Sequence, residues 1–345
     1  MLRKLIVFAM LFLSIALMYA CSKNEGELQP EEKPVVFEKP SNFPNPAYNF
    51  EDNKLTNAGF TLGKKLFYEA RLSADKSVSC GSCHQQFAAF TQLDHKVSHG
   101  VNNCQGKRNT PPLINLAWQK AFFWDGGVKN LETSPLNAIT DACEMGTDIE
   151  TIVAFLKNTA PYPDLFKKAF GSTEINSQLI LKSITQFTGV LVSANSKYDK
   201  VIRKEGGATF TDAEQKGYNL FKEKCAACHK EPFFTDFDYK SNGLDLVSVD
   251  EGRSHITGID ADRGKFRVPT LRNIEYTSPY MHDGRFYSLD EVLEHYNSGI
   301  KASGNLDPLL KNGIPLSGSE KEQIKAFLKT LTDYEFIKNT LYSEA

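Results

Sequence analysis

The sequence predicts an all-α fold made of two similar domains with long irregular loops. Three observations support this prediction: amphipathic helical patterns recur along the chain, strand patterns are weak, and the second half repeats features of the first. The 345 residues suit two domains of roughly 100–200 residues each. The formal net charge is −2 and no basic run stands out, so the sequence predicts no nucleic-acid partner.

Residues 1–20 have the pattern of a bacterial lipoprotein signal peptide. Arg3 and Lys4 precede an apolar stretch that is short for a membrane span, and a small residue comes directly before Cys21. Cleavage at that point would leave Cys21 as the lipid-bearing N-terminus; an ordinary secretory signal cut nearby is the alternative. Residues 21–48 are polar and rich in proline, which predicts a semi-extended tether. We therefore expect a protein of the periplasm or cell envelope that meets the membrane only through its N-terminal lipid anchor.

An internal repeat marks the two halves of the chain. Residues 63–67 resemble residues 217–221, and each stretch precedes a Cys-x-x-Cys-His motif. Residues 152–157 resemble residues 324–329, with apolar side chains at helical spacing in both. The glycine pair at 206–207 is the expected boundary between the halves.

The two Cys-x-x-Cys-His motifs carry the strongest chemical signal. Their positions are Cys80, Cys83 and His84 in the first motif and Cys225, Cys228 and His229 in the second. Two thiols three residues apart can each bond one haem vinyl group, and the histidine that follows can bind the iron. A zinc site would not require a histidine directly after both pairs, and a thioredoxin-like site would need a βαβ pattern, which is absent. The sequence therefore predicts two covalently bound c-type haems with His84 and His229 as iron ligands.

Binding of two haems would explain the long loops that follow the two motifs. Residues 85–109 and 230–267 are long and irregular, which is unusual in a compact domain unless such loops wrap a cofactor. We expect an N-terminal domain over residues 49–205 and a C-terminal domain over residues 206–345, each wrapped around one haem.

Two cysteines remain once the motifs and Cys21 are set aside. They are Cys104 and Cys143, an even pair in a chain whose export would permit disulfides. We expect them to bond to each other; two buried free thiols are the alternative.

Further motifs follow one another along almost the whole mature chain. They are Cys80–His84, Arg108–Pro111, Phe123–Gly126, Glu144–Met145, Cys225–His229, Val268–Asn273 and Pro279–Gly284. In order and spacing this series resembles the bacterial di-haem cytochrome c peroxidase family, which includes the MauG-type enzymes. The resemblance implies two cytochrome c-like domains, with a peroxidatic haem in the first, an electron-transfer haem in the second and a calcium ion between them.

The resemblance also implies roles for single residues. Glu144 matches the acid that would move a proton between the two oxygens of hydrogen peroxide; without the resemblance it would be a solvated or helix-capping glutamate. Trp124 matches the aromatic residue between the haems, where an electron could pass; otherwise it would be a core residue. Asn109, Thr277 and Pro279 match a calcium site, the last two through backbone carbonyls, because hard cations favour oxygen ligands.

The first haem site departs from the family pattern. Classical members of the family close the resting peroxidatic haem with a histidine, and that position is Val101 here, with His95 and His99 nearby. We expect that neither histidine replaces it, so that the first haem is five-coordinate and open. The distal glutamine of the family falls on Ser134, which implies different hydrogen bonding around bound peroxide.

The second haem is expected to be closed by Tyr296. This position carries a methionine in the peroxidases of the family and a tyrosine in MauG-type enzymes, and His295 and Met281 are the alternatives in this chain. A thioether ligand favours ferrous iron, whereas a phenolate favours ferric and higher oxidation states. Arg267 and Arg272 are candidates for pairing with haem propionates or, equally, with loop carboxylates.

The leading functional interpretation is an exported oxidoreductase that reduces hydrogen peroxide to water. Its electrons would come from a small periplasmic donor of the cytochrome c or cupredoxin type. The first alternative is a MauG-like enzyme that oxidises a partner protein through a high-valent haem state. A plain di-haem electron carrier is the third interpretation, and Glu144 beside an open haem argues against it.

Overall fold

The computed structural model describes residues 34–344. The expected signal peptide, Cys21 and the tether as far as residue 33 lie outside the described residues. The chain divides into an N-terminal unit up to Val35 and a compact unit from Val36 onward, which carries both cysteine motifs. Within residues 34–344, no helix has both the length and the apolar character needed to cross a membrane.

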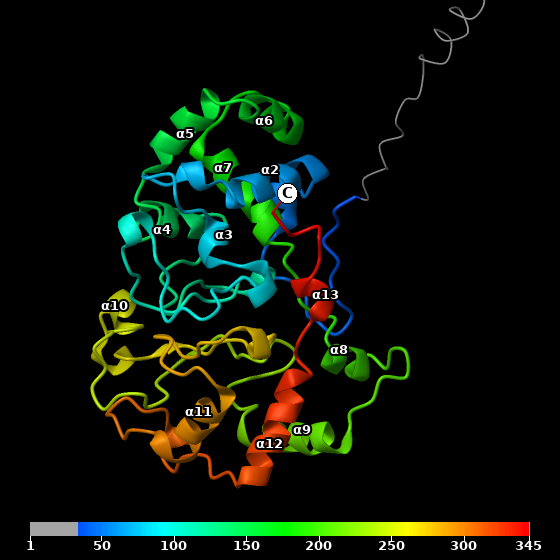
Figure 1. Cartoon of the computed structure of the whole chain (residues 1–345), viewed down its shortest axis with the longest axis vertical. Coiled ribbons are helices and arrows are strands. Elements are labelled where there is room, and N and C mark those ends of the chain that lie inside the picture. Colours follow the sequence, from blue (N-terminus) through cyan, green and yellow to red (C-terminus); the bar gives the residue numbers. More distant parts are fainter. Residues whose placement is uncertain (1–33, 345) are drawn as a thin grey trace, which may run out of the picture. The chain divides into compact units, whose positions relative to one another are not determined.

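The compact unit is mostly helical, as the sequence predicted (Figure 1). Its α-helices are α2 (Asn57–Phe67), α3 (Cys80–Cys83), α4 (Ser134–Thr140), α5 (Ile149–Lys157), α6 (Tyr162–Phe170), α7 (Ser177–Thr188), α8 (Lys197–Ile202), α9 (Asp212–Lys224), α10 (Ser254–Thr257), α11 (Leu289–Glu294), α12 (Gly318–Lys329) and α13 (Tyr334–Ile337). Shorter turns are η1 (Phe50–Asn53), η2 (Ala70–Leu72), η3 (Gln86–Ala88), η4 (Val101–Asn103), η5 (Leu116–Trp118), η6 (Asp260–Asp262), η7 (Ile274–Tyr276), η9 (Pro308–Leu310) and the π-helical η8 (His295–Gly299). Strands β1 (Tyr239–Lys240) and β2 (Phe266–Arg267) pair antiparallel, with Tyr239 opposite Arg267.

Helices α2 and α7 form the centre of the N-terminal half. The Thr56 side chain caps α2 by accepting a hydrogen bond from the backbone N–H of Gly59. A Cβ atom at Gly63 would lie 1.9 Å from the carbonyl oxygen of Ser183, so only glycine allows α2 to approach α7 this closely. Behind this contact lies a hydrophobic cluster that includes Leu62, Leu66, Ile152, Leu156, Tyr162, Phe166, Ile180 and Ile184.

Helices α9 and α12 repeat this arrangement in the C-terminal half (Figure 1). Both begin with a capping box, formed by Thr211 and Glu214 in α9. A Cβ atom at Gly217 would lie 1.9 Å from the carbonyl oxygen of Gln323 in α12. Gly63 and Gly217 are the first residues of the two repeated stretches. The sequence repeat therefore corresponds to two glycine-mediated helix pairs.

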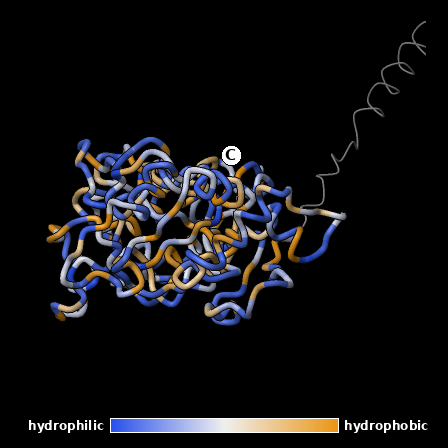
Figure 2. The backbone as a smooth tube through the Cα atoms, turned by 90° about the horizontal axis from the view of Figure 1, so that it is seen from below, coloured by the Kyte–Doolittle hydropathy of each residue, from blue (hydrophilic) through white to orange (hydrophobic). Residues whose placement is uncertain are grey.

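Contacts across the middle of the unit join the two halves. Arg272 forms a two-pronged ion pair with Asp199, both hydrogen bonds measuring 2.8 Å and both side chains being fully buried. The end of the chain returns to the N-terminal half, where the Tyr68 hydroxyl donates to the carbonyl of Tyr342 (Figure 1). Many hydrophilic segments lie on the outline of the unit, whereas hydrophobic segments run through its interior (Figure 2).

Candidate functional site

The first cysteine motif lies on the single turn of α3. Its N-terminus is closed by the reciprocal hydrogen bonds of a capping box, Ser79 with Ser82, and the backbone N–H of His84 donates to the carbonyl of Cys80 at 2.9 Å. Nδ1 of His84 lies 2.7 Å from the carbonyl oxygen of Phe90 and donates to it, which leaves Nε2 free to bind iron. Burial lowers the pKa of His84 to about 4, so the ring is neutral, which is the form that binds metals.

The second motif has the same geometry. Nδ1 of His229 lies 3.0 Å from the carbonyl oxygen of Phe234, and burial again lowers the pKa of the histidine. Phe90 and Phe234 both adopt a left-handed backbone, with φ of 60° and 56°, which is rare for a bulky side chain. Such strained conformations concentrate at functional sites, and here each one presents the carbonyl that orients an imidazole.

The sequence analysis did not assign a role to these two phenylalanines. A signal was nevertheless present, because each is followed by a threonine and stands five or six residues after the motif histidine. The shared Phe-Thr pair therefore marks the carbonyl that orients each histidine.

Glu144 lies beside the first motif. Its carboxylate is close enough to Cys80 and Cys83 to add to the effect of burial, and both causes raise the pKa of these thiols. The Glu144 residue is exposed, yet the protein around its carboxyl raises the pKa of that group, and Asp141 raises it further. The structure thus places a carboxyl group with a raised pKa next to the first Cys-x-x-Cys-His motif.

Val101 is the direct neighbour of Glu144. Its backbone N–H donates to the carbonyl of Glu144 at 2.9 Å, and its side chain is buried. His95 and His99 contact each other, with ring centroids 5.6 Å apart, and Nδ1 of His99 lies 2.6 Å from Oδ1 of Asn103. The residue that meets Glu144 is therefore an apolar side chain that cannot bind iron.

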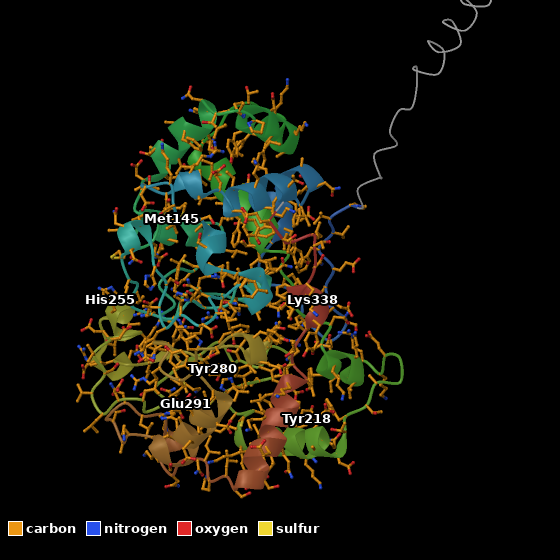
Figure 3. The ribbon with its side chains drawn as sticks, in the orientation of Figure 1. Met145, Tyr218, His255, Tyr280, Glu291 and Lys338 are labelled. Carbon is orange, nitrogen blue, oxygen red and sulfur yellow. A yellow bond between two sulfur atoms is a disulfide. The ribbon has the colours of Figure 1, made fainter. Side chains whose placement is uncertain are left out.

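A mainly apolar cavity adjoins the second motif. Its lining comes from both halves of the chain and includes Thr91, Asn109, Thr110, Trp124, His229, Thr277, Pro279, Tyr280, Met281 and Tyr296. Figure 3 labels Tyr280 among the loops of the C-terminal half. The structure thus brings the two iron ligands predicted for the second haem, the tryptophan and the predicted calcium residues to a single cavity.

Tyr296 faces the second motif, whereas His295 does not line the cavity. Burial raises the pKa of Tyr296 to about 12, a hydrogen bond from Asn242 opposes this shift, and Cys225 and Cys228 add to it. Nε2 of His295 lies 3.0 Å from the carbonyl oxygen of Asn242, so that nitrogen is engaged by the backbone. Of the three candidates for the second axial position, Tyr296 and Met281 remain in the cavity.

Trp124 connects the two halves at this cavity. Its indole N–H donates to the carbonyl of Asn109 at 2.8 Å, and its own carbonyl accepts from the backbone N–H of Arg267 at 2.7 Å. The Arg267 guanidinium donates to Oε1 of Gln119 and to the carbonyl of Phe123, which are neutral acceptors. Burial lowers its pKa to about 10, so an anionic group such as a haem propionate would be stabilised there.

Arg272 does not share this property. Its guanidinium is already paired with the carboxylate of Asp199. Of the two partners considered for Arg272, a haem propionate or a carboxylate of the protein, the structure shows the carboxylate. Of the two arginines, only Arg267 has neutral hydrogen-bond partners that fit an added anion.

The residues expected to bind calcium carry neutral oxygens. Asn109, Thr277 and Pro279 line the same cavity, and the Asn109 side-chain amide donates weakly to the carbonyls of His95 and Lys96. Within residues 34–344, no group of three or more His, Cys, Asp or Glu side chains is arranged to hold a metal ion. A calcium ion here would therefore be held by amide and carbonyl oxygens completed by water.

Comparison with known proteins gives the family. Residues 57–207 match the family model described as di-haem cytochrome c peroxidase. The methylamine utilization protein MauG of Methylorubrum extorquens is 36% identical over 301 residues, which cover 86% of this chain and 83% of the relative. Cytochrome c551 peroxidase of Nitrosomonas europaea is 36% identical over 276 residues, 79% of each chain. This chain belongs to the di-haem cytochrome c peroxidase family.

Solved structures agree with this assignment. A MauG-like protein associated with microbial copper homeostasis superposes with a TM-score of 0.83 at 33% identity, over 90% of this chain and 99% of that one. The di-haem peroxidase BthA of Burkholderia thailandensis has the same fold, with a TM-score of 0.73 at 20% identity over 85% of this chain and 91% of that one. Family membership makes the chain a peroxidase-type oxidoreductase with two haem c groups, as its two attachment motifs predicted.

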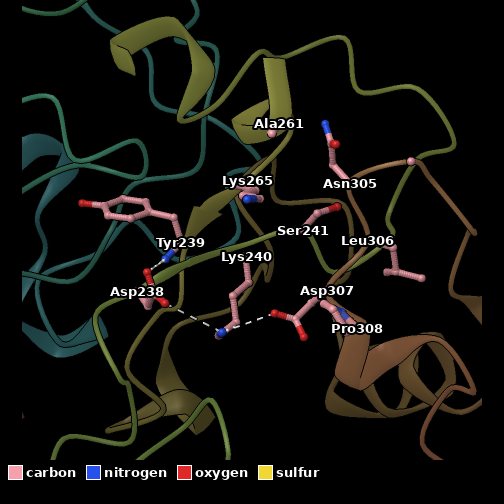
Figure 4. Close-up of a pocket in the computed structure, with 11 residues that line it drawn as sticks. Asp238, Tyr239, Lys240, Ser241, Ala261, Lys265, Asn305, Leu306, Asp307 and Pro308 are labelled. Atoms are coloured by element: carbon pink, nitrogen blue, oxygen red, sulfur yellow. Dashed lines mark hydrogen bonds and ion pairs between the residues drawn. The ribbon is translucent and has the colours of Figure 1, made fainter. Parts of the chain in front are cut away.

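A different cavity lies on β1 and takes no part in this site (Figure 4). Its lining includes Lys240, whose ammonium group lies 3.3 Å from Asp307 and 3.9 Å from Asp238. Neither the haem-attachment residues nor the candidate ligands line it.

Proposed function

We propose that this protein is an exported di-haem peroxidase that reduces hydrogen peroxide to two molecules of water. The reaction consumes two electrons and two protons per peroxide, and the electrons come from a small exported cytochrome c or cupredoxin. The observation that carries this proposal is that different residues surround the two Cys-x-x-Cys-His motifs. Glu144 and Val101 lie beside the first, and Tyr296 lies across the cavity from the second.

The chain would form two cytochrome c-like domains, residues 49–205 and 206–345, each wrapping one haem with its long loop. The two glycine-mediated helix pairs support this division, as does the repeated Phe-Thr turn after each motif. His84 and His229 would be the iron ligands on the attachment side, each held by the backbone carbonyl that its Nδ1 contacts.

At the first site, Glu144 would move the proton. When bound, the haem would supply the iron and the electrons that break the oxygen–oxygen bond. The Glu144 carboxylate would take a proton from one oxygen of the peroxide and deliver it to the other, which would leave as water. A raised pKa suits this role, because the group must both take up and release a proton. Val101 keeps the face open, because a valine side chain cannot occupy an iron ligand position.

Trp124 would carry electrons from the second site to the first. It lines the second cavity, and its indole is held by the backbone of Asn109 in the N-terminal half. Two transfers through this position deliver the two electrons of one turnover. A calcium ion held by Asn109, Thr277 and Pro279 would also fix the position of Trp124. Asn109 would bind the ion, and its carbonyl accepts the hydrogen bond of the Trp124 indole.

We also propose that the protein is exported and anchored by a lipid at Cys21. The signal pattern of residues 1–20 supports export. The disulfide between Cys104 and Cys143 is typical of an oxidising compartment.

Steady-state turnover tests the proposed reaction. The protein loaded with both haems is mixed with hydrogen peroxide and a reduced small cytochrome c or cupredoxin, and donor oxidation is followed. We expect two donor molecules to be oxidised per peroxide consumed. Rapid reaction with peroxide but no donor oxidation would reject the peroxidase proposal.

The second candidate is MauG-like oxidation of a partner protein. Tyr296 in the second cavity favours it, because phenolate ligation stabilises oxidised iron, and so does the 36% identity to MauG. Persistence of the peroxide-oxidised protein without donor turnover would favour this candidate. A plain electron carrier would not react with peroxide at all.

A further inference from the structure

A disulfide joins the loop at Val101 to the segment that carries Glu144. The bond links Cys104 with Cys143, 39 residues apart, with Cα atoms 4.9 Å apart. Cys143 directly precedes Glu144, and Cys104 directly follows η4, which begins at Val101. The covalent bond therefore connects the two segments that flank the proposed peroxide site.

The backbones of these segments also meet closely. The N–H of Val101 donates to the carbonyl of Glu144 at 2.9 Å. A Cβ atom at Gly100 would lie 2.1 Å from the carbonyl oxygen of Cys143 and 2.5 Å from that of Glu144, so a larger residue would separate the segments. Within the loop, the N–H of Gly100 donates to the carbonyl of Cys104 at 2.8 Å. The disulfide closes a small structure whose two sides are in direct contact.

Glu144 has few other restraints. It lies in the turn between α4 and α5, where its N–H donates to the carbonyl of Asp141 at 3.0 Å. The N–H of Cys143 donates to the Asp141 carboxylate at 2.7 Å. On the other side of Glu144, buried Met145 is held by a long-range hydrogen bond, its carbonyl accepting from the N–H of Ala74 at 2.9 Å. Exposed turns open at low free-energy cost unless long-range contacts hold them. The bond to Cys104 supplies such a contact on the Cys143 side.

We propose that the Cys104–Cys143 disulfide is a positioning device that holds the Glu144 carboxyl over the first haem site. The inference rests on the proposed peroxidase function, because it assigns the bridge to the proton-transfer step. The bridge does not touch peroxide. It fixes the backbone of Glu144 against the loop of Val101. Such positioning matters because the rate of proton transfer falls steeply when a general acid–base group is displaced by a small distance.

Hydrogen exchange tests whether the disulfide restrains the backbone at Val101 and Glu144, without using any haem reaction. The variant Cys104→Ser with Cys143→Ser is compared with the unchanged protein, both loaded with haem. We expect amide exchange at Val101, whose N–H bonds Glu144, to become at least tenfold faster, with exchange in α9 and α12 unchanged. Unchanged exchange at Val101 would overturn the inference.

A double-mutant cycle tests the link to catalysis. The rate of peroxide reaction with the ferric protein is measured for the bridge variant, for Glu144→Gln and for their combination. If the bridge acts through Glu144, the combination will be as slow as Glu144→Gln alone. Multiplication of the two separate effects would show that the bridge acts elsewhere and would overturn the inference.

Leu331→Ala provides the matched control for lost stability. Leu331 is fully buried in the C-terminal hydrophobic cluster, none of whose residues lies in the bridged segments. Combined with Glu144→Gln, it should give independent effects.

The outcomes separate the two proposals. If the unchanged protein fails to react with peroxide, the proposed function is wrong. The exchange experiment still tests whether the disulfide restrains the backbone at Val101 and Glu144. If peroxide reacts at the same rate with and without the bridge, the positioning inference alone is wrong.

Discussion

Tyr296 and His229 line the same cavity, in the C-terminal half of the molecule. Nδ1 of His229 contacts the carbonyl oxygen of Phe234, and the backbone of Pro269 also hydrogen-bonds this imidazole. Nε2 would then be the nitrogen that binds the iron. The buried phenol of Tyr296 is close enough to Cys225 and Cys228, the expected attachment points of the second haem, for them to affect its pKa. This relationship supports the proposal that the second iron is bound by a histidine on one side and a tyrosine on the other.

Replacing the tyrosine should change the potential of the second haem. We expect Tyr296→Met to raise it by about 0.1 V or more, because axial ligands set haem potentials over about 0.8 V and a thioether favours ferrous iron. Spectroelectrochemical titration measures the shift. Tyr287→Met is the control, because that tyrosine is exposed and does not line the cavity, so its replacement should leave the potential unchanged. An unchanged potential in Tyr296→Met would remove this residue as a ligand.

Removing the proton-transfer group should slow the peroxide reaction. We expect Glu144→Gln to lower the second-order rate constant by roughly 10²–10⁴-fold, the usual contribution of a general acid–base group. Stopped-flow absorption of the haem follows the reaction. Asp141→Asn changes a neighbouring carboxylate and should have a much smaller effect. Similar losses in both variants would assign the effect to the local charge rather than to Glu144.

The two tryptophans of the chain provide a matched pair. Trp124 and Trp118 are both buried, and each donates its indole N–H to a backbone carbonyl at 2.8 Å. Only Trp124 lines the second cavity. We expect Trp124→Phe to slow electron transfer between the haems, as seen by flash photolysis, while Trp118→Phe leaves it unchanged. Equal rates in the two variants would argue against a path through Trp124.

The buried pair of Asp199 and Arg272 should dominate acid stability. Asp199→Ala should destabilise the protein by about 3–5 kcal/mol, because it leaves an unpaired buried guanidinium. Removing Glu335, whose pair with Lys200 is exposed, should cost about 0–1 kcal/mol. Denaturant unfolding measures both.

The pH dependence of this pair follows from the pKa of Asp199. Burial alone would raise that pKa, but the hydrogen bonds and charge of Arg272 outweigh burial and lower it. The stabilisation is therefore complete above the unfolded pKa of about 3.9 and is lost as the pH falls below it toward the folded pKa. Asp199→Ala should flatten the stability profile in this acid range. An equally steep profile in the variant would assign acid unfolding to other carboxylates.

The mostly helical fold and the two haem-attachment motifs could be recognised from the sequence because both depend on the local spacing of residues. Helical periodicity and a capping box specify α9, and the motif histidines follow their cysteines directly. The role of Gly63 and Gly217 was harder to see. Their need for close approach appears only when a second helix, distant in sequence, packs on each.

Long-range pairings were the least predictable part of the site. Nothing near Arg272 in the sequence points to Asp199, which lies 73 residues earlier, and the propionate alternative was equally reasonable. The carbonyls of Phe90 and Phe234 were missed because a left-handed backbone leaves only a weak sequence signal in residues other than glycine. The disposition of Tyr296, His295 and Met281 likewise needed the folded loops, since adjacent residues of a helix face different directions.

Electron paramagnetic resonance of the oxidised protein, carrying two haems per chain, tests the central claim most directly. We predict one high-spin ferric signal from the open haem at His84 and one low-spin signal of equal intensity from the haem bound by His229 and Tyr296. Tyr296→Met should change only the low-spin signal. Two low-spin signals in the unchanged protein would show that both irons are closed and would contradict the account.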